Sequence, residues 1–363
     1  MDYDDIRIMA LSLAKVGLGN PLPKEVQERL DLELNTIRSN GLDIVYSFAM
    51  KLADKSRHYA YLVGNNGAIG SSWLVYLLGI TNCNPLPQKY NGFNIPFEIF
   101  AGIDFNKTLD ITLNVAEDIH KDTCEYLDEL LKEKEIYKDS GDITNNGYCA
   151  YFKRNIETKE GKLLANITIT THPLLMQLKE LHKLTNIFPP RVLLNEKKEE
   201  VSKIVSLLIK EQFYDHADLE DILDIISKIE INTIDKLVMV VGVLFGTGTK
   251  ETREALIESI TSDLSPIISS RDDIMIYLMQ KGIDRITAYY IMENVRKGKG
   301  ITAEMEDVML KHNIPNWYIE LCNKIDYLFP KAHNVERAIM EYRLAWYGIN
   351  YPAEYAKVME KWR

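Results

Sequence analysis

The sequence predicts an α+β fold, with a small group of strands in the first half of the chain and helices on both sides of it. Two observations carry this prediction. Segments 107–115 and 166–170 alternate polar and apolar residues, as strands with one polar face do. Both ends of the chain instead repeat apolar residues at helical spacing, and the last hundred of the 363 residues follow that pattern almost throughout. A chain of this length can bury a large core and predicts two or three lobes.

The N-terminal part of the chain begins with predicted helices. Apolar Val26, Leu30 and Leu34 recur among charged residues over 23–37, and a glycine at position 41 separates this helix from the next. Glycine and serine clusters then mark where the pattern changes. We expect a helix over 42–55, a short strand over 60–63, a glycine loop over 64–70 and a helix over 71–78 that begins at two serines.

The first alternating strand has one distinctly polar face. Asp110, Thr112 and Asn114 lie on one side of it, and the intervening Ile111 and Leu113 lie on the other. A charged helix and a cluster of polar turn residues are predicted to separate it from the second strand, after which the pattern returns to helices. The expected ranges are 118–138 for the charged helix, 139–146 for the turns, and 174–184, 197–212 and 219–229 for the later helices.

The composition is that of an ordinary globular protein with an acidic balance. The chain has 43 basic and 53 acidic residues, for a formal charge of −10, which disfavours indiscriminate binding to nucleic acid but allows a local basic groove. No apolar run approaches the roughly 20 residues of a membrane helix, and the first five residues are acidic where a signal peptide is basic. We therefore expect a cytoplasmic protein with no membrane partner.

The four cysteines do not form a metal-binding pattern. Cys83, Cys124, Cys149 and Cys322 lie far apart, without a Cys-x-x-Cys pair or a histidine at ligand spacing. We interpret them as reduced thiols and expect no zinc.

The glycine loop has the parts of a phosphate-binding turn. A predicted strand, several glycines and a helix beginning with two hydroxyls allow backbone amides to approach an anion. An ordinary strand-to-helix turn explains the same residues, and the Gly-Lys-Ser/Thr ending of a P-loop is missing. The candidate nucleotide- or phosphate-binding residues are Gly64, Asn66, Gly67, Gly70, Ser71 and Ser72.

Several collinear motifs resemble the palm and fingers of PolC, the replicative DNA polymerase III alpha subunit of the C family. The resemblance covers residues 19–111 and 232–355, and the middle of the chain matches weakly. The palm-like motifs are Asn20-Pro21-Leu22-Pro23-Lys24, Tyr61-Leu62-Val63-Gly64, Gly70-Ser71-Ser72, Gly79-Ile80-Thr81, Asn84-Pro85-Leu86-Pro87 and Ile95-Pro96-Phe97-Glu98. The fingers-like motifs are Arg271-Asp272-Asp273-Ile274-Met275, Val295-Arg296-Lys297-Gly298-Lys299-Gly300, Pro315-Asn316-Trp317-Tyr318-Ile319 and Phe329-Pro330-Lys331-Ala332-His333.

The resemblance implies a palm of the polymerase-beta-like nucleotidyltransferase type, a small mixed sheet with helices, followed by a mostly helical fingers domain. Accordingly, we predict a palm-like domain over 1–185 and a fingers-like domain over 186–363. The thumb that the family carries between the two palm strands is expected to be reduced here to about 118–162.

In this family three aspartates bind two magnesium ions that promote nucleotide transfer. The resemblance places Asp110 at the first aspartate, Thr112 at the second and Asn166 at the third. Because threonine and asparagine are neutral, the site loses most of the charge that holds magnesium near a triphosphate. Replacement by Asp104, Glu117 or Asp118 would need a different backbone position. Magnesium is expected as a cofactor only if activity remains.

Other departures from the family point in the same direction. Asn66 replaces a basic residue of the glycine loop and Ala68 replaces a serine, which weakens the binding of a triphosphate. The basic loop near position 298 is retained, and family analogy implies that it touches phosphates, although a solvated helix end explains its charges as well. The candidate nucleic-acid-binding residues are Arg296, Lys297, Lys299, Lys331 and His333.

Three functions remain open from the sequence. The first is a catalytically degenerate polymerase paralogue, a pseudo-polymerase, that binds primer–template DNA, nucleotide or a replisome protein. The second is a residual DNA-directed nucleotidyltransferase that uses Asp110 and magnesium. The third is a pure protein-interaction module, which the net charge of −10 favours.

Overall fold

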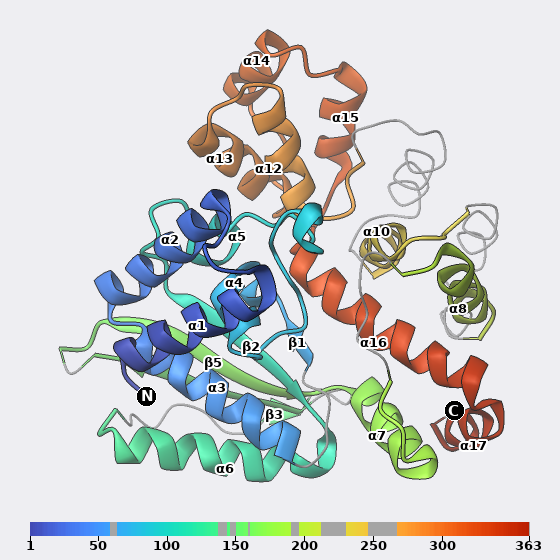
Figure 1. Cartoon of the computed structure of the whole chain (residues 1–363). Helices are drawn as coiled ribbons and strands as arrows, with labels where there is room; N and C mark the ends of the chain where they lie inside the picture. The colour runs from blue at the N-terminus through green and yellow to red at the C-terminus, as the bar shows by residue number, and fades with distance from the viewer. Residues whose placement is uncertain are drawn as a thin grey trace. The chain divides into compact units, whose positions relative to one another are not determined.

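The computed structural model describes residues 1–58, 64–136, 144–145, 150–158, 160–189, 196–211, 230–245 and 267–362. The chain forms two compact units (Figure 1). Unit 1 comprises Met1–Arg191 and Ile339–Arg363, and unit 2 comprises Val192–Ala338. The strand predicted over 60–63, the helix predicted over 219–229 and Cys149 lie outside the described residues.

Unit 1 is built on a five-stranded mixed sheet with the strand order β1-β2-β5-β4-β3. β2 and β5 pair in parallel, and the other neighbours pair antiparallel. The predicted strands at 107–115 and 166–170 are confirmed, and together with the surrounding helices they confirm the α+β fold. The strand bounds are Gly64–Asn66 (β1), Leu109–Val115 (β2), Thr144–Asn145 (β3), Ala150–Glu157 (β4) and Leu163–Thr171 (β5).

One face of this sheet is apolar and is covered by helices. Ile111 of β2 and Ile167 of β5 are buried there, as the alternation predicts. Helix α3 (Asp43–His58) packs on β2, and helix α6 (Glu117–Glu133) packs on β5. Arg154 of β4 belongs to the same face, because its Nε donates to Asp128 Oδ1 of α6 at 2.7 Å. The opposite face carries the polar residues of the strands.

Unit 1 contains three further helices whose ranges the sequence pattern predicted, together with α1 and several short helices. The helices predicted over 23–37 and 42–55 are confirmed as α2 and α3, and α1 precedes them. The helix predicted over 174–184 is confirmed as α7. The bounds are Tyr3–Leu18 (α1), Lys24–Asn40 (α2), Ile69–Ser71 (η1), Trp73–Leu77 (α4), Gln88–Tyr90 (η2), Glu98–Ala101 (α5), Pro173–Thr185 (α7) and Pro352–Trp362 (α17).

The stretch 118–162, predicted as a reduced thumb, contributes directly to the sheet layer. Its described residues form α6, β3 and β4, and β4 pairs with β5 along its length. The charged helix ends at Glu133 rather than at position 138, and Thr144–Asn145 lies in a strand where turns were expected. The described part of this stretch therefore belongs to the same compact unit as the palm-like strands.

Among the described residues of unit 2, the regular elements are all helices, joined by turns and loops, in agreement with the predicted pattern. Ser270 and Asp273 form a capping box at the start of α12, and Asp284 and Thr302 cap α13 and α14. Helix α16 begins in unit 2 and ends in unit 1. The bounds are Lys198–Glu211 (α8), Ile234–Phe245 (α10), Arg271–Gln280 (α12), Arg285–Val295 (α13), Ala303–Lys311 (α14), Asn316–Lys324 (α15) and Lys331–Asn350 (α16).

Among the described residues, no helix combines the length and apolar character needed to cross a membrane. Cys83, Cys124 and Cys322 are buried free thiols. Burial raises the pKa of the Cys124 thiol to about 12, which keeps it protonated and unreactive.

Candidate functional site

The polar face of the sheet brings Asp110 and Asn166 into direct contact. The two residues are register partners on the parallel strands β2 and β5. Asn166 Nδ2 donates a hydrogen bond to Asp110 Oδ1 at 2.8 Å. Asp110 is exposed and Asn166 is half-buried, so the pair lies at the surface of the sheet. Two positions that the family resemblance relates to metal-binding aspartates are therefore adjacent in this fold.

Thr112 lies on the same face, two residues further along β2, and is half-buried. Its register partners are Asn66 on β1 and Thr168 on β5. The next polar position, Asn114, is fully buried. Its side-chain amide exchanges two hydrogen bonds with that of Asn66, at 2.9 and 3.2 Å, which compensate for the loss of water. This reciprocal pair holds the side chain of Asn66 against the sheet, at the position where the family carries a basic residue.

These residues do not fit a two-magnesium site. Magnesium is held by anionic oxygen atoms, and a two-metal centre needs several carboxylates to offset its charge. The central positions of this face supply one carboxylate, one hydroxyl and one amide, and the amide nitrogen points at the carboxylate. Among the described residues, no three histidine, cysteine, aspartate or glutamate side chains are grouped as metal ligands.

Two of the three acidic residues that could replace a lost metal ligand lie away from Asp110. Glu117 and Asp118 follow the far end of β2, and a strand rises about 3.3 Å per residue, so Val115 is already about 16 Å from Asp110. The carboxylate of Asp118 forms an ion pair with Lys179 of α7. Asp104 is exposed in the segment before β2. The structure thus places Glu117 and Asp118 too far away to complete the site.

The predicted glycine loop consists of a strand, a turn and two short helices. Gly64–Asn66 is β1, which pairs antiparallel with β2. Gly67 turns the chain with a φ of 78°, a conformation that favours glycine. η1 follows, and the Ser72 hydroxyl caps α4 by accepting a hydrogen bond from Val75 N at 3.3 Å. The first three residues of the predicted loop are therefore a strand, and the turn begins at Gly67.

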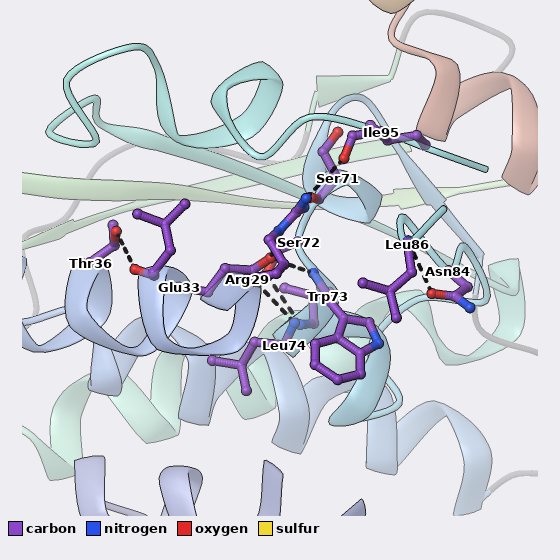
Figure 2. A network of polar contacts seen from close by, with 12 residues as sticks. Arg29, Glu33, Thr36, Ser71, Ser72, Trp73, Leu74, Asn84, Leu86 and Ile95 are labelled. Atoms are coloured by element: carbon purple, nitrogen blue, oxygen red, sulfur yellow. Dashed lines mark hydrogen bonds and ion pairs between the residues drawn. The ribbon is translucent and has the colours of Figure 1, made fainter. Parts of the chain in front are cut away.

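The N-terminus of α4 is occupied by an internal carboxylate, as Figure 2 shows. Glu33 of α2 has no exposed surface and accepts hydrogen bonds from Ser72 Oγ at 2.6 Å, Trp73 N at 2.9 Å and Leu74 N at 3.0 Å. Arg29, one turn earlier on α2, donates from its Nε to Glu33 Oε1 at 2.5 Å. Its Nη2 also donates to the Ser71 carbonyl oxygen at 2.6 Å.

The carboxylate of Glu33 thus lies where the sequence predicted a bound phosphate. Ser71 and Ser72 have no exposed surface, and Gly70 is buried. A carboxylate on a helix N-terminus satisfies the same free amides and the same dipole that a phosphate would. In this structure the two serine hydroxyls are therefore not accessible to a phosphate, and of the candidate residues only Asn66 and Gly67 retain partial exposure.

Arg296 and Lys297 of the basic loop share one acidic partner. Arg296 Nη2 and Lys297 Nζ each lie 2.8 Å from Glu293 Oε2. Burial alone would raise the pKa of Glu293, but the hydrogen bonds from these two cations outweigh it and lower the pKa to about 2. The Arg296 side chain is 14% exposed and that of Lys297 is 44% exposed. Lys299 is exposed as well, so two of the three predicted cations face solvent.

Lys331 and His333 lie inside unit 2. Lys331 is 9% exposed, and its Nζ lies 3.3 Å from Asp273 Oδ1. His333 stacks on Phe329 with ring centroids 4.6 Å apart, and burial, aided by Arg337, lowers the pKa of His333 to about 4. Neither side chain faces solvent as those of Lys297 and Lys299 do.

Three charged residues of these sites were not singled out by the sequence pattern: Glu33, Lys153 and Glu293. Lys153 lies on β4, which was not predicted, and it projects from the same face as Asp110. The only local signal at Glu293 is the helical spacing of an acid three and four residues before two cations. At Glu33 no local signal exists, since α2 carries several acids at similar spacing.

Comparison with known proteins shows that the chain is similar to bacterial DNA polymerases III. Residues 6–152 match the family model of the bacterial DNA polymerase III alpha NTPase domain. The chain is 29% identical to the PolC-type DNA polymerases III of Caldanaerobacter subterraneus, Thermotoga petrophila and Listeria monocytogenes, over 96% of its own length. The matched part is 33%, 34% and 32% of those proteins, respectively.

The chain thus spans about a third of the length of the curated relatives it matches. The alignment with the first of them runs over 470 positions, more than the 363 residues of this chain, so that relative carries inserted residues with no counterpart here. The family resemblance inferred from the palm-like and fingers-like motifs is confirmed.

Proposed function

Since the chain is a PolC-like relative of the DNA polymerase III alpha subunit, we propose that it is a catalytically degenerate polymerase, a pseudo-polymerase. Its role is to bind nucleic acid, nucleotide or a replication protein in the context of DNA replication, without transferring nucleotides. The activity of the longer relatives is not carried over with the likeness, because the chemistry depends on three particular side chains.

The hydrogen bond between Asn166 and Asp110 carries this proposal. A carboxylate that shares magnesium with a second carboxylate faces it across the metal, whereas here an amide N–H donates directly to Asp110 at 2.8 Å. Thr112 adds a hydroxyl, which is a weak ligand without charge. One negative charge at the centre of the site does not balance two divalent cations and a triphosphate.

The exposed cations of unit 2 support a binding role. Lys297 and Lys299 lie on either side of Gly298, which has a φ of 67° and ends the helical stretch of α13. Glu293 is the shared acidic partner of Arg271, Arg296 and Lys297, so this cluster keeps an excess of positive charge, to which the exposed Lys299 adds. Contacts of this kind to phosphates are weakened by salt, which makes them measurable.

Primer extension tests the loss of catalysis. The full chain is incubated with a primer–template duplex, deoxynucleoside triphosphates and magnesium or manganese, next to Asp110→Ala. We expect no extension by either protein. Extension by the wild type that disappears in Asp110→Ala would replace the proposal with the residual nucleotidyltransferase that the retained, exposed Asp110 favours.

Fluorescence anisotropy with the same labelled duplex tests the binding role. We expect binding that weakens with salt, and a Lys297→Gln/Lys299→Gln variant that binds about tenfold more weakly with a shallower salt dependence. Lys311→Gln, an exposed lysine on α14 of the same unit, is the matched control and should leave binding unchanged. No binding of duplex or nucleotide by the wild type would favour the protein-interaction module instead.

A further inference from the structure

Among its described residues, the polar face of the sheet carries one cation, Lys153, whose role is not explained by the fold. The strand registers align Asn66, Thr112, Thr168 and Lys153 in one row across β1, β2, β5 and β4. The neighbouring row contains Asp110, Asn166 and Asn155. Register partners project to the same side of a sheet, so Lys153 shares a face with Asp110.

Lys153 is exposed and, among the described residues, forms no ion pair. Strands lie about 4.8 Å apart, which places its Cα about 10 Å from that of Thr112, within reach of a long side chain lying over Thr168. The adjacent cation, Arg154, projects from the opposite face of the sheet and forms an ion pair with Asp128, with Nη2 to Oδ2 at 3.0 Å. The ammonium group of Lys153 is therefore available to bind a ligand at the polar face.

This face carries less negative charge than the family resemblance implies for active relatives. The resemblance implies three carboxylates here in active relatives, and such a face attracts cations. In the two described rows of this chain one carboxylate, Asp110, is set against one ammonium group, Lys153, among neutral amides and hydroxyls. Glu157, near the end of β4, lies beyond a register irregularity and has a partner of its own. A face with balanced charge has no strong attraction for magnesium.

We infer that this face binds a phosphate group directly, through the Lys153 ammonium, without a metal ion. The hydroxyls of Thr112 and Thr168 flank the path of the lysine side chain, and neither has a hydrogen-bond partner among the described residues. Hydroxyl donors and an ammonium group are the combination that binds phosphate oxygen atoms. The inference rests on the proposed function and specifies the ligand chemistry of its palm-like face.

Asp110 distinguishes this arrangement from a remnant of catalysis. In a metal site, Asp110 holds the cation that binds the phosphate, so its neutralisation weakens binding. In the arrangement inferred here, Asp110 repels the phosphate, so Asp110→Asn strengthens binding, by about two- to threefold at low salt. The two interpretations thus predict opposite signs for one substitution.

The test measures binding of the full chain to two probes in the presence of EDTA: a labelled primer–template duplex and a deoxynucleoside triphosphate. We expect at least one probe to bind, about three- to tenfold weakening by Lys153→Gln and the strengthening by Asp110→Asn. Binding of the duplex alone identifies a backbone phosphate as the ligand, and binding of the nucleotide alone identifies its triphosphate. Lys121→Gln, an exposed lysine of α6 on the covered side of the sheet, is the control and should change nothing.

Two results would overturn the inference. One is unchanged affinity for both probes in Lys153→Gln. The other is binding that requires magnesium and is lost in Asp110→Asn. If the duplex still binds and still depends on Lys297 and Lys299, the proposed function survives while this inference fails.

Discussion

Glu33 shows how one residue can decide the character of a loop. It is fully buried, and it satisfies two backbone amides and a hydroxyl at the start of α4 while pairing with Arg29. A buried carboxylate is tolerated only with such compensation, because its desolvation is costly. The turn that resembles a phosphate cradle therefore carries its own anion, supplied by α2.

This arrangement predicts a large effect of removing one charge. Glu33→Gln retains the shape but leaves Arg29 partly buried without its counter-ion, so we expect a loss of about 3–5 kcal/mol in the free energy of unfolding. Urea denaturation should show a lower midpoint with an unchanged slope. Glu25→Gln on the same helix removes a surface ion pair with Lys89 and should shift the midpoint far less, because solvent screens exposed pairs. Equal midpoints for the two variants would mean that Glu33 is not a stabilising residue.

For single residues, the sequence predicted on which face of a strand a side chain lies better than it predicted which distant residues the side chain contacts. Alternation along β2 placed Asp110 and Thr112 on one face, because a period of two is a local property of a strand. The resemblance added Asn166, and the register of β2 with β5 brings it to Asp110. Glu33 could not be predicted, because α2 contains other acids at helical spacing and only the packing of α4 selects the buried one.

At the scale of elements, the two central strands were predicted and their antiparallel neighbour was not. The apolar residues of β2 and β5 alternate regularly, whereas β4 places Arg154 on the covered face. A charged residue at a core position hides the alternation, and its compensation by Asp128 comes from a different element. The family resemblance suggested a reduced thumb over 118–162, and no sequence pattern indicated that this stretch contains β4.

Two glycines in helices provide a prediction at this scale. In α10, a Cβ at Gly242 would clash with the Ser269 carbonyl oxygen and lie 2.6 Å from Asn334 Nδ2. Gly242→Ala should therefore destabilise unit 2 by about 1–3 kcal/mol. In α1, nothing lies within 4 Å of a Cβ at Gly17, so Gly17→Ala should stabilise the chain by up to about 1 kcal/mol. Thermal unfolding followed by circular dichroism measures both variants. Shifts of the unfolding temperature in the same direction would contradict the different surroundings of the two glycines.

At the scale of the whole molecule, unit 1 is completed by residues from both ends of the chain. Residues 339–363 belong to it, and Met340, Tyr347 and Val358 are buried in its core. Trp362 Nε1 donates to Glu180 Oε2 of α7 at 3.2 Å. This return of the chain is invisible in local sequence patterns, since helical periodicity shows that a face is apolar but not which distant element covers it.

Because the C-terminal segment packs in unit 1, we expect a disruptive substitution in α17 to destabilise unit 1. Val358 of α17 is 2% exposed in a helix that packs on α7, whereas the adjacent Lys357 faces solvent. Val358→Asp buries an unpaired charge, which should strip hydrogen-exchange protection from the amides of α7 while those of α12 and α13 in unit 2 keep theirs. Lys357→Asp makes the same change at the surface and should leave every helix protected. Loss of protection in α12 and α13 together with α7 would show that the two units unfold as one, and that the C-terminal segment stabilises more than the core it completes.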